Sequence, residues 1–142
     1  MKEASRKLKK KLNYYCVSVR RKRRNPKKNY STVCVGVEDS TQRIQICSLS
    51  CCNSSGYVFH QDLKYRLEKL GKIGITKNRN CVLGNCAEPH AANALLIRLN
   101  RRNKPHWVTI DTSQFVFTKA LRVRTHQIVD YCSFCKQTFP QL

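Results

Sequence analysis

Acidic residues are scarce in this chain of 142 residues, because eight Asp and Glu stand against 28 Lys and Arg and leave a formal net charge of +20. Long apolar runs are absent too. No stretch approaches the roughly 18 residues of a transmembrane helix, and no apolar segment follows the basic N-terminus as in a secretory signal peptide. With 41% hydrophobic residues the chain is not wholly disordered. The charge favours a polyanion as partner, above all nucleic acid, and not a membrane.

An even set of cysteines is also missing. The chain has nine, which excludes a fully paired disulfide framework. Reduced thiols, some of them on a metal, fit this number better and predict an intracellular, reducing site of action.

Residues 1–29 are predicted to form a basic, flexible N-terminal arm. Thirteen of the 28 basic residues lie within positions 1–28, with a single acid at Glu3. The run from Arg20 to Lys28 repels itself and contains Pro26, which interrupts a helix. Such an arm is either a solvated tail or a segment that contacts phosphates and resembles a nuclear-localisation signal.

Hydrophobic periodicity and turn residues predict a strand pair followed by alternating helices and strands. The predicted segments are strands at 32–37 and 43–49, helices at 61–70 and 87–99, a strand at 107–111, short strands at 115–117 and 121–124, and a helix at 130–139. The helix at 87–99 is apolar nearly all round and is therefore expected in the centre of the fold. The order predicts one α/β domain over residues 30–142, in which helices cover a mixed sheet.

Two segments carry residues suited to chemistry. Cys132 and Cys135 stand three positions apart at the start of a predicted helix, where both thiols can bind one metal ion. Cys86 and Glu88 precede Pro89 at the start of the apolar helix, and Pro at that point is typical of a first helical turn. Glu88 has two candidate roles: a carboxylate that caps the helix, and a buried acid that needs a neighbouring cation. The two roles are compatible.

A Cys or His, one residue and a Glu, followed later by Cys-x-x-Cys, is the signature of zinc-dependent nucleobase deaminases. Through Cys86-Ala87-Glu88 and Cys132-Ser133-Phe134-Cys135, this chain resembles the cytidine-deaminase-like superfamily. Within it, Cys-Ala-Glu-Pro-His-Ala-Ala is most similar to bacterial polymorphic-toxin-type deaminases. Tyr131 stands where the family has Pro, and 44 positions from Glu88 to Cys132 is a long gap for the family.

The resemblance implies a three-layer α-β-α fold with a mixed central sheet and helices on both faces. It also implies that Cys86, Cys132 and Cys135 bind Zn²⁺ and leave a fourth position for water. Glu88 would shuttle protons while the zinc-bound hydroxide attacks C4 of cytosine or C6 of adenine. A toxin-type protein would act as a delivered effector and have an inhibitor or immunity protein as a partner.

Two other arrangements stay open. His90 lies four positions after Cys86 and could close a four-ligand structural zinc site with the three cysteines, although Pro89 argues against this spacing. The cysteines could also bind no metal. The alternative function is a zinc-stabilised, basic nucleic-acid-binding module without catalysis, and a catalytically dead deaminase-like domain is a third hypothesis.

A base within DNA or RNA is the expected substrate, cytosine rather than adenine, because a free nucleoside gains nothing from the high charge. The candidate base contacts are Asn85, Asn93, Trp107 and Phe134. Core packing is the alternative role for the two aromatic residues. The candidate phosphate contacts are Arg20, Arg21, Lys22, Arg23, Arg24, Arg101 and Arg102.

Overall fold

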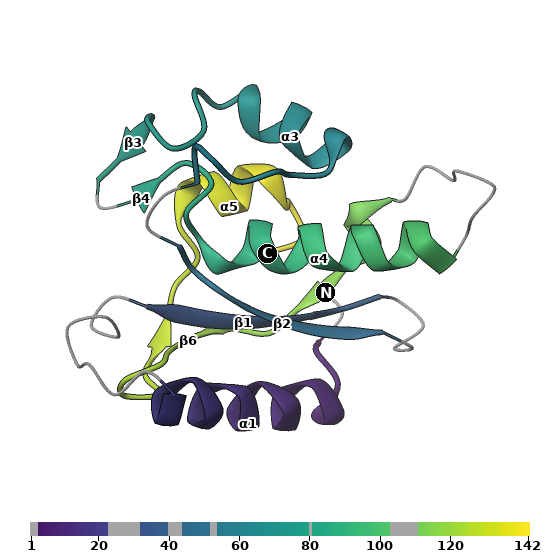
Figure 1. The fold of residues 1–142 in the computed structure, drawn as a ribbon, viewed down its shortest axis with the longest axis vertical. Helices are drawn as coiled ribbons and strands as arrows, with labels where there is room; N and C mark the ends of the chain where they lie inside the picture. Colours follow the sequence, from purple (N-terminus) through teal and green to yellow (C-terminus); the bar gives the residue numbers. More distant parts are fainter. Residues whose placement is uncertain (1–2, 23–31, 40–43, 52–53, 80, 103–110) are drawn as a thin grey trace.

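An antiparallel sheet with helices on both faces forms the centre of the molecule (Figure 1). The structure, a computed structural model, describes residues 3–22, 32–39, 44–51, 54–79, 81–102 and 111–142. The helices are α1 (Arg6–Lys22), α3 (Gln61–Glu68), α4 (Ala87–Arg102) and α5 (Ser133–Thr138), with a 3₁₀ turn η1 (Thr112–Gln114). The strands are β1 (Val33–Glu38), β2 (Gln45–Leu49), β3 (Lys77–Asn78), β4 (Cys81–Val82), β5 (Val116–Phe117), β6 (Ala120–Arg122) and β7 (Ile128–Val129). The α/β class predicted from the sequence is confirmed.

The sheet differs from the mixed one that was expected, because every pairing between the described strands is antiparallel. A short connection, such as the one that joins β6 to β7, favours antiparallel neighbours. The two segments expected to pair with each other, β5 and β6, instead both pair with β1, at Val37↔Phe117 and Cys34↔Leu121. The register shifts by one residue between these pairs, which is the geometry of a β-bulge.

The N-terminal segment is the largest departure from the sequence-based expectation. Residues 6–22 form α1, which packs on β1 and β2, so the prediction of a flexible arm is wrong for these residues. Leu8, Leu12, Cys16 and Val19 recur every three to four positions and are all buried. This apolar stripe is hard to recognise in the sequence, because the many lysines and arginines on the other faces of the helix dominate the segment. Residues 23–29 lie outside the described part.

Close packing of α1 depends on Gly36 in β1. A Cβ at this position would lie 3.0 Å from Leu8 Cδ1 and 3.2 Å from Thr118 Cγ2. The start of α1 is held by the buried carboxylate of Glu38, which accepts hydrogen bonds from Ser5 N (2.8 Å) and Ser5 Oγ (2.7 Å). Ser5 Oγ in turn accepts from Leu8 N (3.1 Å), which satisfies a free amide of the first turn.

A disulfide joins Cys16 of α1 to Cys34 of β1 within a small apolar cluster, where the sequence had suggested reduced thiols. Cys47, Cys81, Cys86, Cys132 and Cys135 form no disulfide. The disulfide covalently fixes α1 to the sheet.

The main core lies on the opposite face of the sheet. It contains Val35 and Val37 of β1, residues of α3 and α5, and Ala91, Leu95 and Leu96 of α4. The predicted helices at 61–70, 87–99 and 130–139 are confirmed by α3, α4 and α5 within a few residues. Positions 107–110 of the predicted strand lie outside the described residues, whereas Asp111 caps η1 by accepting a hydrogen bond from Ser113 N. No helix in the described ranges is long and apolar enough to cross a membrane.

Truncation of a buried α1 side chain tests its role in the fold. Leu8 is fully buried, so we expect Leu8→Ala to lower the free energy of unfolding by about 2–5 kcal/mol, as measured by urea denaturation. Lys10 is exposed on the same helix, and Lys10→Ala should change stability by less than about 0.5 kcal/mol. Equal, negligible effects of both substitutions would mean that α1 does not belong to the folded core.

Candidate metal centre

The start of α4 presents Cys86 and Glu88, which are two positions apart. Cys86 immediately precedes the helix, which begins at Ala87, and Pro89 lies in the first turn as the sequence predicted. Pro is tolerated there because the first amides of a helix have no partner within it. Glu88 is only 4% exposed, so its carboxyl group is almost completely removed from solvent.

The start of α5 presents the second pair of thiols. Cys132 is the N-cap residue of this helix, its side chain makes no capping hydrogen bond, and Cys135 is buried in the first turn. Tyr131 fixes the preceding loop, because its hydroxyl donates a hydrogen bond of 2.9 Å to the Thr118 carbonyl oxygen next to β5. This contact anchors the segment at the position where the deaminase signature has Pro.

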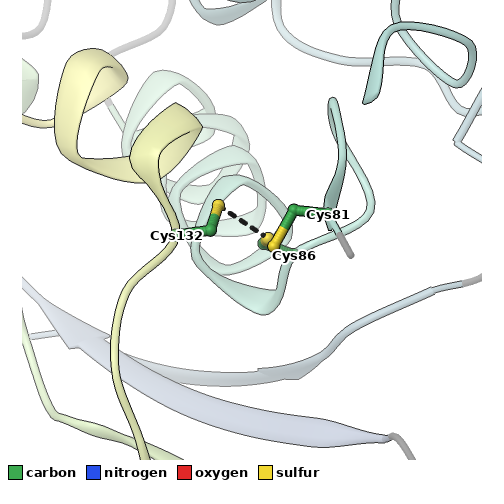
Figure 2. A group of neighbouring side chains, drawn as sticks. All are labelled: Cys81, Cys86 and Cys132. Carbon is green, nitrogen blue, oxygen red and sulfur yellow. Dashed lines mark hydrogen bonds between the residues drawn. The ribbon is translucent and has the colours of Figure 1, made fainter. Parts of the chain in front are cut away.

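Sulfur atoms from the two helix starts converge (Figure 2). Cys86 Sγ lies 3.2 Å from Cys132 Sγ, and Cys132 Sγ lies 3.6 Å from Cys135 Sγ. Cys86 and Cys135 Sγ lie within 4.8 Å of each other and of the Glu88 carboxylate, whose Oε2 accepts a hydrogen bond of 3.4 Å from Cys135 Sγ. Around a tetrahedral zinc, sulfurs at about 2.3 Å from the ion are about 3.8 Å apart. The three thiols therefore fit one such ion.

A fourth sulfur, which the sequence analysis missed, joins the group. Cys81 of β4 lies with its Sγ within 4.8 Å of those of Cys86 and Cys132, and Figure 2 shows it beside Cys86. The spacing of Cys81 and Cys86, with four residues between them, was the available sequence signal, but it falls outside the deaminase signature and was not used. Cys81, Cys86, Cys132, Cys135 and Glu88 together form what we call the sulfur cluster.

Proton sharing dominates the electrostatics of the sulfur cluster. Hydrogen-bonding contacts with Cys135 and then with Cys86 lower the pKa of Cys132 to about 2, which favours the thiolate form at this sulfur. The same contact with Cys132 raises the pKa of Cys86 and of Cys135. Burial raises the pKa of Glu88. Without a cation, one thiolate is thus stabilised by protonated neighbours, whereas a divalent ion would compensate the charge of several thiolates at once.

No protein-family model, curated protein or solved structure gives a significant match to this chain. The centre is consequently interpreted from its own geometry and chemistry.

His90 does not belong to either group of residues that could hold a metal ion, so the described residues do not support the alternative four-ligand site with this histidine. Its Nε2 lies 2.8 Å from the Gly84 carbonyl oxygen and 3.1 Å from Cys51 Sγ, and the ring packs edge-on against Tyr57. The physical reason is the one that Pro89 suggested: Cys86 precedes the helix, so the i, i+4 relation does not place the two side chains on a common face.

The candidate base contacts mostly have structural roles. Asn93 is buried and binds the His60 amide and the Val58 carbonyl oxygen, which fixes the entry to α3. Phe134 belongs to the main core. Asn85, which is partly exposed beside Cys86, accepts a hydrogen bond of 3.2 Å from Ser54 N. Trp107 lies outside the described residues.

Those candidate phosphate contacts that belong to the described residues lie away from the sulfur cluster. Arg20, Arg21 and Lys22 form the exposed last turn of α1, on the sheet face opposite to α4 (Figure 1). Arg101 and Arg102 form the C-terminal end of α4, whereas the cluster lies at its N-terminal end. Arg23 and Arg24 lie outside the described residues. Nearer to the sulfur cluster, the exposed Lys77 and Arg79 flank Asn78 in the segment just before Cys81.

Zinc should stabilise the folded chain if the thiols form one site. We expect zinc at about a hundredfold excess over Kd to add about 2.7 kcal/mol to the stability of chelator-treated protein, seen as a rise in Tm. Cys132→Ala removes the central sulfur and should abolish most of this rise, whereas Cys47→Ala, a free cysteine in β2, should keep it. A zinc response that is the same in both variants would contradict the site.

Burial of Glu88 predicts a pH effect on the metal-free protein. Because folding raises the pKa of this carboxyl, the unfolded chain ionises first as pH rises above about 4.5, and wild-type stability then falls. Glu88→Gln cannot ionise. We expect it to match the wild type near pH 4 and to be more stable near pH 8, measured by urea unfolding with a chelator present. A stability difference between Glu88→Gln and the wild type that does not change with pH would exclude this effect. The control is Glu68→Gln, because Glu68 lies on the exposed side of α3.

Proposed function

We propose that this chain is a zinc-dependent hydrolytic deaminase that converts cytosine to uracil in nucleic acid. One observation carries the proposal: the thiols of Cys86, Cys132 and Cys135 converge on a point beside the buried carboxyl of Glu88. These are the residues by which the chain resembles the cytidine-deaminase-like superfamily. The layered α/β arrangement is compatible with that fold, and the finer fold assignment is part of the same proposal.

In this proposal the three cysteines bind the metal ion and Glu88 transfers protons. A zinc ion on the three thiolates would supply the Lewis acidity that makes a water molecule nucleophilic near neutral pH. Glu88 accepts a proton from the water, delivers it to the ring nitrogen of the base and later protonates the leaving amine. The net reaction consumes cytosine and water and releases uracil and ammonia. Burial suits Glu88 to this role, because a nearby cation lowers a raised carboxyl pKa toward the working range.

The distribution of charge supports a polynucleotide as the substrate. Basic residues on the exposed faces of α1 lie on one side of the sheet, whereas Lys77 and Arg79 lie close to Cys81 in sequence. A phosphate chain attracted by the overall charge can use the basic residues near the cluster as local contacts. The surface of α1 would then hold flanking nucleic acid and not the reacting base.

A direct test uses zinc-loaded protein with four substrates, namely single- and double-stranded DNA and RNA, followed by sequencing for C-to-U and A-to-I changes. We expect C-to-U conversion, and Glu88→Gln should reduce it by about 10²–10⁴-fold or more while zinc content is unchanged. A-to-I changes instead would assign an adenine deaminase. Absence of conversion on all four substrates by zinc-loaded wild type would refute the proposal.

A second candidate, a zinc-stabilised nucleic-acid-binding module without catalysis, is favoured by the position of Cys81. Four thiolates form a closed structural site that leaves no position for water. In this case Glu88→Gln would leave nucleic-acid affinity unchanged, and no variant would turn over any base. Cys81 thus decides between an open centre and a closed one.

A further inference from the structure

Cys81 reaches the sulfur cluster from an element of its own. Among the strands of the described residues, β3 and β4 pair only with each other, through Lys77↔Val82 and Asn78↔Cys81, and lie outside the main sheet. Cys86 and Cys135, by contrast, come from the starts of α4 and α5, both of which pack into the main core. The cluster therefore combines three sulfurs on a rigid base with one on a small separate hairpin.

The hairpin is held against α5 next to Cys132. Asn78 Nδ2 donates a hydrogen bond of 2.6 Å to the hydroxyl of Ser133, the residue that follows Cys132. At its base, Leu83 N donates to Thr76 O, and Gly74 N donates to Leu83 O, both over 2.9 Å. With the base fixed and the Asn78–Ser133 contact formed, Cys81 Sγ lies within 4.8 Å of the sulfurs of Cys86 and Cys132.

We propose that Cys81 is the fourth sulfur ligand of the metal ion when no substrate is bound, and that water replaces it when the centre opens. The first half concerns ligation alone, and the second half rests on the proposed deaminase function. In the exchange, the metal–sulfur bond to Cys81 breaks, the oxygen of water takes the vacated position, and the released thiolate takes up a proton from solvent. The charge of a divalent ion with its ligands changes from −2 with four thiolates to −1 with three.

The anchoring of the four sulfurs indicates which one exchanges. Cys135 is buried within α5, and Cys86 and Cys132 precede helices whose apolar faces fill the core. The hairpin has less of this support: Cys81 itself packs against the main core, but Lys77, Asn78 and Arg79 are exposed and Cys81 and Val82 are only half-buried. Elements with few buried contacts open at a lower free-energy cost than core elements. The exposed Asn78–Ser133 hydrogen bond is the contact that must break for the hairpin to move from α5.

The ligands can be counted by zinc K-edge X-ray absorption on the full chain loaded with one equivalent of zinc. We expect four sulfurs at about 2.3 Å in wild type, and three sulfurs with one oxygen or nitrogen at about 2.0 Å in Cys81→Ala. Cys47→Ala removes a cysteine from β2 and should retain four sulfurs. Asn78→Ala leaves every cysteine in place and should lower the mean sulfur number below four by releasing the hairpin. It serves as the second variant if Cys81→Ala does not fold.

Each outcome has a separate meaning. Three sulfurs and one light atom in both wild type and Cys81→Ala would overturn the ligation by Cys81 and leave the proposed deaminase intact. Fewer than three sulfurs in wild type would refute the deaminase centre as well. If wild type has four sulfurs, faster base conversion by Cys81→Ala than by wild type, at equal zinc content, supports the exchange. Loss of conversion in that variant, or its absence in both proteins, would overturn the exchange while the ligation stands.

Discussion

The mutual repulsion of closely spaced thiolates is the constraint on which the centre depends. Sulfur atoms 3.2–3.6 Å apart in a partly buried site cannot all be negatively charged unless a cation lies among them. In the metal-free arrangement, contacts with the neighbouring thiols lower the pKa of Cys132, and contact with Cys132 raises the pKa of Cys86 and of Cys135. Glu88 adds a further acid to the same volume. A divalent ion would relieve all these contacts together, so the cluster is a group of residues that could hold a metal ion.

The scaffold that holds the cluster is a sheet covered on its two faces by helices of different character. β1 is buried over almost its whole length, because α1 contacts one face and α4 the other. On α4 the apolar side chains build the main core and the helix start presents Cys86 and Glu88. On α1 a narrow apolar stripe, the disulfide and the Ser5–Glu38 contacts suffice for anchoring, which leaves the other faces free for basic residues. The sheet thus separates a large part of the positive charge from the sulfur cluster.

This separation bears on how a polynucleotide would be used by such a protein. In the proposed function, charge on α1 would raise affinity without regard to sequence, since contacts with phosphates carry no information about the base. Selectivity for the reacting base would arise at the other face, around the sulfur cluster, where the partly exposed Asn85 and the exposed Lys77 and Arg79 are available. The two functions can therefore be altered independently by substitution.

Local patterns in the sequence were sufficient to predict the strand pair 33–38 and 45–49 and the helices α3, α4 and α5. They were also sufficient to predict which types of residue form the candidate metal centre. Periodicity of 2 or 3.6 and the Pro89 helix start are local properties, so a linear reading finds them. The apolar stripe of α1 was also local, but the density of charge concealed it.

Only the tertiary structure decided which separated residues meet. It placed Cys86 next to Cys132, which is 46 positions away in the sequence, and it turned His90 toward Gly84 and Cys51. It also added Cys81 from a hairpin that no periodic pattern in the sequence predicts. It also paired β5 and β6 with β1 and joined Cys16 to Cys34. These outcomes depend on how helices and strands pack around a shared core. Packing is a property of the whole chain, whereas periodicity and spacing are properties of its segments.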